Sequence, residues 1–247
     1  MHIHKLLLLT IGLLLASSAS GVDIKATATK AEDFVPEGWK LHSVAYGDLN
    51  RDGQEDVALV IQGTDKKKTI SFSDNYGNGT LTTNPRALLI AFRKDDTYEL
   101  VLKNETLLPC QDGTVWDENG TAIAERPWFD DLLDEGGIKI TPGNTLKIKL
   151  DYYAPYGKPA SSTITYTFRH QNSRFELIGL DAKHITPKRE HSVSVNYSTG
   201  KILETIMDDD NDEPSSRTIE KWLSQDETGY DLQTLDFVTL DNIASQF

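Results

Sequence analysis

Residues 47–62, GDLNRDGQEDVALVIQ, place acidic and amide side chains at short intervals directly before an apolar run. Counted from Asp48 as position 1, further oxygen-bearing side chains fall at positions 3, 5 and 9. Calcium is a hard cation that takes six to eight oxygen ligands in flexible geometry. Four such side chains, with the main-chain carbonyl at position 7, can surround one ion. The spacing therefore predicts a calcium site formed by Asp48, Asn50, Asp52, Gln54 and Asp56.

Two further properties of this segment favour ion binding over an ordinary acidic turn. Gly53, at position 6, has the backbone freedom that lets a chain curl around an ion. Three carboxylates this close in sequence repel each other, and a bound cation removes that repulsion, so the ion should stabilise the fold. The alternative is an acidic turn without an ion, because Asp, Asn and Gly are also common turn residues.

The segment is not an EF-hand. An EF-hand loop has a glutamate at position 12, whereas position 12 here is Leu59, inside the apolar run. Gly47 before the loop and DVALV after it resemble the FG-GAP/VCBS-type calcium loop of integrin α-subunit propellers and many exported bacterial proteins. The resemblance implies the same five ligands. The motif occurs once, and because a propeller needs several blades, a full propeller is not expected.

A wider resemblance extends over most of residues 39–200. The segments W…GDLNRDGQEDVALV, ALLIAF, TFRHQNSRFELIGLD and SVNYSTG, in that order, resemble a group of uncharacterised bacterial envelope proteins. This resemblance implies export and no particular activity.

Residues 1–21 have the layout of a secretory signal peptide: a basic start with Lys5, the apolar run LLLLTIGLLL at 6–15, and the small residues ASSASG. The alternative, a membrane anchor, requires a longer apolar run than this one. No later segment is apolar enough to cross a membrane. We therefore expect an exported protein, periplasmic or extracellular, without membrane insertion.

The formal net charge of −13 restricts the partners. A chain this acidic is poorly suited to phosphate backbones, so nucleic-acid partners are not expected. An envelope protein or polysaccharide is the expected kind of partner. Cys110 is the one cysteine, so no intramolecular disulfide can form; it is a small buried residue, a reactive thiol or a thiol that pairs between chains.

Short alternating segments with β-branched and aromatic residues dominate the rest of the chain, which is typical of β-strands. In TLKIKLDYY, for example, Leu146, Ile148, Leu150 and Tyr152 fall on one face. Pairs of such segments flank short polar turns, so we expect antiparallel hairpin and meander sheets. The predicted fold class is mainly β (α+β), as a single β-rich domain over 22–247 with the calcium-loop hairpin at 41–62.

A few short helices are expected beside these sheets. Residues 126–137 have Pro127 near a plausible helix start, and 215–225 carry Ile219, Trp222 and Leu223 at helical spacing. Residues 240–247 are expected to form a short helix or a frayed end. Residues 63–84 have many turn formers and no strong periodicity, which predicts an excursion between strands.

Two other acidic groups offer weaker candidates for chemistry. Residues 208–213, DDDNDE, favour a solvated loop over a second cation site, because no glycine stands at the required place. Asp130, Asp131, Asp134 and Glu135 gather on the expected helix, where a polar face is more common than paired catalytic carboxylates. No catalytic residue is assigned. The leading hypothesis is an exported calcium-binding protein; the alternatives are an envelope-polymer hydrolase and a calcium-dependent adhesion module.

Overall fold

A computed structural model of the protein describes residues 21–74, 77–110, 114–116, 122–125, 133, 137–154, 160–209, 215–224 and 228–247. The expected signal peptide lies outside these residues except for Gly21. Most of the helix expected at 126–137 and residues 210–213 of the acidic run also lie outside them.

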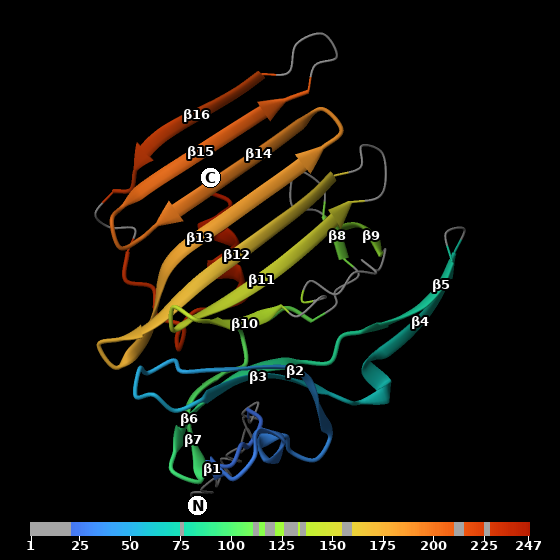
Figure 1. Ribbon diagram of the computed structural model, residues 1–247. Coiled ribbons are helices and arrows are strands. Elements are labelled where there is room, and N and C mark those ends of the chain that lie inside the picture. The colour runs from blue at the N-terminus through green and yellow to red at the C-terminus, as the bar shows by residue number, and fades with distance from the viewer. Residues whose placement is uncertain are drawn as a thin grey trace, which may run out of the picture.

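Two antiparallel sheets make up most of the described chain (Figure 1). The five-stranded sheet has, in spatial order, β1 (Thr27–Ala28), β7 (Thr97–Asn104), β6 (Arg86–Lys94), β3 (Asp56–Gly63) and β2 (Trp39–Gly47). The seven-stranded sheet is a meander of β10 (Ile138–Thr141), β11 (Thr145–Ala154), β12 (Ala160–Gln171), β13 (Arg174–Thr186), β14 (Arg189–Asn196), β15 (Lys201–Asp208) and β16 (Ser215–Trp222). The prediction of a mainly β fold with antiparallel hairpins and meanders is therefore confirmed.

The remaining elements are small. The helices are the 3-10 turns η1 (Ala31–Phe34) and η2 (Lys66–Lys68) and the α-helix α1 (Phe237–Ala244). Two hairpins stand apart from the large sheets, formed by β4 (Thr69–Asp74) with β5 (Gly77–Thr82) and by β8 (Thr114–Trp116) with β9 (Ala122–Glu125). No helix among the described residues combines the length and apolarity that a helical membrane crossing requires.

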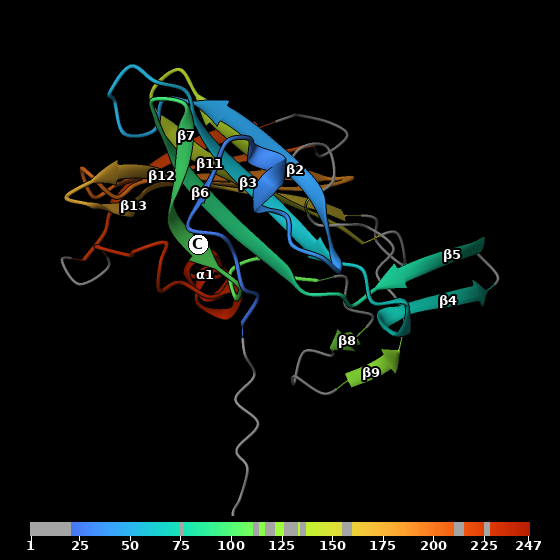
Figure 2. The same ribbon diagram turned by 90° about the horizontal axis from the view of Figure 1, so that it is seen from below.

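Two expectations about local structure were wrong in part. The helix expected at 215–225 is instead the strand β16, because residue-by-residue pairing with β15 overrides the helical spacing of its apolar residues. All eight residues of β16 are exposed, so Ile219 and Trp222 do not form a buried helical stripe. The excursion at 63–84 folds into the β4–β5 hairpin, which Figure 2 shows projecting away from both sheets. The short helix expected at 240–247 is present, beginning earlier at Phe237.

The five-stranded sheet is covered on both faces, which explains the continuous apolar run after the acidic loop. All eight residues of β3 are buried. Val57, Leu59 and Ile61 pack with Phe34 of η1, which crosses this face in Figure 2. Ala58 and Val60 point the other way and pack against the seven-stranded sheet. A strand with no solvent-facing side does not alternate in polarity.

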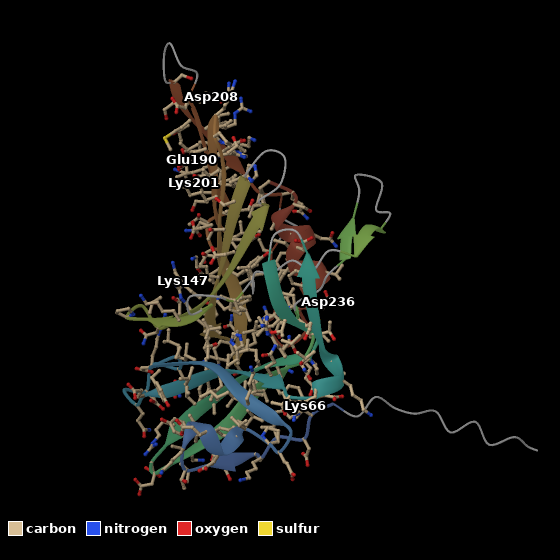
Figure 3. The ribbon with its side chains drawn as sticks, turned by 90° about the vertical axis from the view of Figure 1, so that its right-hand side faces the viewer. Lys66, Lys147, Glu190, Lys201, Asp208 and Asp236 are labelled. Carbon is tan, nitrogen blue, oxygen red and sulfur yellow. The ribbon has the colours of Figure 1, made fainter. Side chains whose placement is uncertain are left out.

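The larger core lies between the two sheets and α1. Leu146, Ile148 and Leu150 are fully buried on the inner face of β11, as their spacing predicted. Beside them, the Tyr166 hydroxyl donates to the carbonyl of Leu240 in α1 at 3.0 Å. Figure 3 shows the two sides of this sheet, with Lys147, Glu190 and Lys201 on the outer side and Asp236, which caps the N-terminus of α1, on the inner side.

The sheets meet closely where β2 ends, and this contact gives a testable prediction. A Cβ added to Gly47 would lie 2.5 Å from Cγ2 of Ile140 in β10. A β-branched side chain beside the backbone cannot swing away, so Gly47→Ala should lower the free energy of unfolding by about 1–3 kcal/mol. Urea denaturation measures this loss.

A matched control is Gly179→Ala in β13, whose added Cβ would meet its nearest neighbours at 3.6 Å, an ordinary contact. That variant should unfold close to the wild type. In the double variant with Ile140→Ala, the loss should be smaller than the sum of the two single losses. Strict additivity would show that the contact with Ile140 is not the cause.

Candidate metal centre

The predicted calcium loop connects β2 to β3 and is closed at its base by the pairing of Gly47 with Asp56. Asp48 accepts three backbone hydrogen bonds at the centre of the loop. Its Oδ1 accepts from the amides of Arg51 at 2.6 Å and Asp52 at 3.2 Å, and its Oδ2 accepts from Gly53 at 3.1 Å. These bonds curl residues 48–53 around one carboxylate.

In the middle of the loop, side-chain oxygens also accept from backbone amides, but the partners are only two residues apart in sequence. Asn50 Oδ1 accepts from the amide of Asp52 at 2.9 Å, and Asp52 Oδ1 accepts from the amide of Gln54 at 2.8 Å. The Asn50 amide nitrogen donates to Asp52 Oδ2 at 3.0 Å. Arg51 at φ 67° and Gly53 at φ 84° are both left-handed, which is the conformation that glycine was expected to supply. The side chains of Asp48, Asn50 and Asp52 are thus drawn toward the backbone inside the curl.

Asp56 lies at a different depth from the other predicted ligands. It is fully buried, and its Oδ2 accepts from the amides of Leu49 at 2.7 Å and Asn50 at 3.2 Å. Its Oδ1 accepts from the amide of Arg93 in β6 at 2.9 Å. Burial raises the pKa of Asp56 above its ordinary value, while these three backbone hydrogen bonds act in the opposite direction. This residue, one of the predicted ligands, therefore joins the loop to the sheet.

Two anchors, which the sequence pattern did not predict, fix the loop between the sheets. Leu49 is fully buried in the core shared by both sheets. Asn144, in the turn between β10 and β11, donates from its side chain to the main-chain carbonyl of Asp48 at 2.5 Å. An isolated leucine between acidic residues is a recognisable sign of an anchor. Nothing in the local sequence connects Asn144 with a loop 96 residues earlier in the chain.

The donor set of the loop fits a hard divalent cation. Every predicted ligand atom is an oxygen, from Asp48, Asn50, Asp52 and Asp56 and the Gln54 carbonyl, as calcium prefers. An ionised carboxylate has about four acceptor sites, and Asp56 uses three for backbone amides. In the part of the chain that the structure describes, no three His, Cys, Asp or Glu side chains are grouped closely enough to hold an ion by themselves.

The other candidates from the sequence are only partly described. Asp130, Asp131, Asp134, Glu135 and residues 210–213 lie outside the described residues. Asp208 and Asp209, with Glu190, are among the residues lining a surface depression of about 370 Å³ at the end of β14 and β15. Asp208 is paired with Arg189 at 2.5 Å, and Glu190 with Lys183 at 2.8 Å. Cys110 is a half-buried free thiol.

In comparisons with known proteins, no family model, curated protein or solved structure matches the chain. The resemblance of residues 47–62 to the FG-GAP/VCBS-type loop therefore stays a prediction.

The hydrogen bonds of Asp56 predict a stability effect that does not depend on any ion. Asp56→Ala removes the acceptor of three amides, and a buried amide without a partner costs about 1–3 kcal/mol. We expect the free energy of unfolding to fall by about 3–5 kcal/mol in the presence of a chelator. Urea denaturation followed by circular dichroism measures the fall.

The matched control is Asp52→Ala, in the same loop but exposed. Its loss in chelator should stay within about 1 kcal/mol, since water can replace its hydrogen bonds. Equal losses for the two variants would contradict a special structural role for Asp56.

Proposed function

We propose that the protein is an exported, calcium-binding, β-rich protein in which one structural ion occupies the 48–56 loop. The supporting observation is the curl of the loop around Asp48, with three amides hydrogen-bonded to one carboxylate and left-handed residues at 51 and 53. A loop already curved in this way needs little rearrangement to direct several oxygens at one ion.

The ion would act where the two sheets meet. Asp48 is tied to the β10–β11 turn through Asn144, and Asp56 is tied to β6 through the amide of Arg93. A cation beside Asp56 favours its ionised form and so offsets the cost of burying that carboxylate. Binding would therefore stabilise the junction between the sheets and leave the outer face of the larger sheet free for a partner.

Export and the kind of partner belong to the same proposal. The signal-peptide pattern of residues 1–21 supports a periplasmic or extracellular location, where free calcium is available. A net charge of −13 disfavours nucleic acid. An envelope protein or a polysaccharide fits a binding or structural role in that location.

The hydrolase alternative has one specific observation in its favour. Asp208 and Asp209, from the acidic run, line the same depression as Glu190. However, Asp208 and Glu190 each form an ion pair with a basic neighbour. These ion pairs already engage both carboxylates with basic side chains, so the depression supports this alternative less well than the calcium proposal. This alternative predicts that Asp209→Asn abolishes cleavage of an envelope polysaccharide.

The adhesion alternative requires a continuous exposed apolar patch. Leu203, Met207 and Trp222 are exposed on the outer face of β15 and β16. Thr205 lies between the first two, and Lys201 is paired with Trp222 across the strands. The apolar side chains are therefore separated by polar ones, which supports this alternative less well than the calcium proposal.

Calcium binding predicts a shift in thermal stability. At a calcium concentration one hundred times Kd, binding adds about 2.7 kcal/mol to the free energy of unfolding. For a chain of this size, that corresponds to a rise in Tm of about 5–10 °C over the value in chelator. Asp52→Ala should lose most of the rise, because it removes an exposed ligand without a large effect on the fold itself.

The control is Asp209→Ala, which changes an acidic residue far from the loop and should keep the full rise. Elemental analysis of the purified protein reports the bound metal directly. An unchanged Tm together with no bound metal would rule out the site.

A further inference from the structure

Two histidines face each other across neighbouring strands of the seven-stranded sheet. His184 of β13 and His191 of β14 are direct partners in the antiparallel register. Directly opposite residues project to the same side of a sheet, with Cβ atoms about 4.5–5.5 Å apart. Two imidazole rings at this separation can reach one metal ion without rearrangement of the backbone.

The pair lies on the inner side of the sheet, at the margin of the core. The next pair inward is Ala182 with Val193, and both contact the core between the sheets. Because side chains alternate between faces, the histidines share this face, whereas Glu190, next to His191, lies on the outer side (Figure 3). His184 is exposed, and the His191 side chain is 27% exposed. An ion can therefore reach the pair from solvent.

The hydrogen bonds of His191 leave one ring nitrogen available for a metal. Nε2 of His191 lies 2.9 Å from Oε1 of Glu204, and the ammonium of Lys221 contacts Oε2 of the same carboxylate. With its other oxygen in contact with an ammonium, the Glu204 carboxylate is placed to accept a hydrogen bond from His191. When Nε2–H of His191 donates to Glu204, Nδ1 is the ring nitrogen left to bind a metal.

His184 is held in a complementary way. Its Nδ1 lies 2.7 Å from Oγ of Ser162 on β12, and the hydroxyl can accept from Nδ1–H. In that tautomer, Nε2 presents its lone pair. Among the described residues, no group forms a hydrogen bond with Nε2 of His184 or with Nδ1 of His191.

We propose that His184 and His191 bind a divalent transition-metal ion, such as Cu²⁺, Ni²⁺ or Zn²⁺, with water completing its coordination. Imidazole nitrogen suits these metals, whereas calcium requires oxygen ligands. Glu204 orients His191 as carboxylates orient metal-binding histidines in general, through the ring nitrogen opposite to the metal. The site is separate in chemistry and position from the 48–56 loop and does not depend on the function proposed above.

The test is a Cu²⁺ titration of the untagged full-length chain, followed by calorimetry and by electron paramagnetic resonance. The wild type should bind Cu²⁺ with hyperfine structure from imidazole nitrogen. His184→Ala and His191→Ala should each weaken binding at least about tenfold, and Glu204→Gln should weaken it about 10–100-fold. His2 and His4 are present in every variant, so differences between variants report on the pair alone.

Two control variants distinguish binding at the histidine pair from binding elsewhere on the chain. Ser192→Ala changes the neighbour of His191 on the opposite face and should leave Cu²⁺ affinity unchanged. Asp52→Ala should leave it unchanged as well, while losing the calcium response. Circular dichroism without metal confirms that each variant is folded. Equal affinity in the wild type and both histidine variants, or a loss in only one of them, would overturn the proposal.

Discussion

The junction between the two sheets depends on the buried carboxylate of Asp56. One side chain without access to water accepts hydrogen bonds from Leu49 and Asn50 in the loop and from Arg93 in β6. Burying a charge is unfavourable unless its acceptor sites are filled. The loop must therefore fold back over Asp56, and this places Leu49 in the shared core and brings the Asp48 carbonyl to Asn144. The curl of the acidic segment and the contact between the sheets are consequences of the same constraint.

Much of the fold could be predicted from the sequence because most strands are hairpin partners with a clear alternation. The β11–β12 pair is an example, since the two strands are hairpin partners and each has one apolar face. β16 could not be predicted, because all of its residues are exposed and no buried face gives the strand a period of two. The β4–β5 hairpin was missed for a related reason, as its polar and glycine-rich strands resemble a loop in composition.

The curl of the candidate loop was predictable from the sequence, but its anchors were not. The positions of Asp48, Asn50, Asp52 and Gly53 follow from local spacing alone, and the loop adopts the left-handed residues that such spacing requires. The bond by which Asp56 ties the loop to β6 was not predictable, because its partner is a main-chain amide 37 residues later in the chain. The His184–His191 pair was missed for the same reason: only the register of β13 on β14 brings these two residues together.

β16 is an edge strand of the large meander, and its composition bears on whether another strand can pair with it. An edge strand offers a row of backbone donors and acceptors to any extended chain that approaches. Here, that row is accompanied by the exposed charges of Arg217, Glu220 and Lys221. Glu220 forms an ion pair with Lys201 of β15, and Lys221 forms one with Glu204 of β15. A strand that paired with this edge would have to desolvate these charges, which makes such pairing unfavourable although all eight residues of β16 are exposed to water.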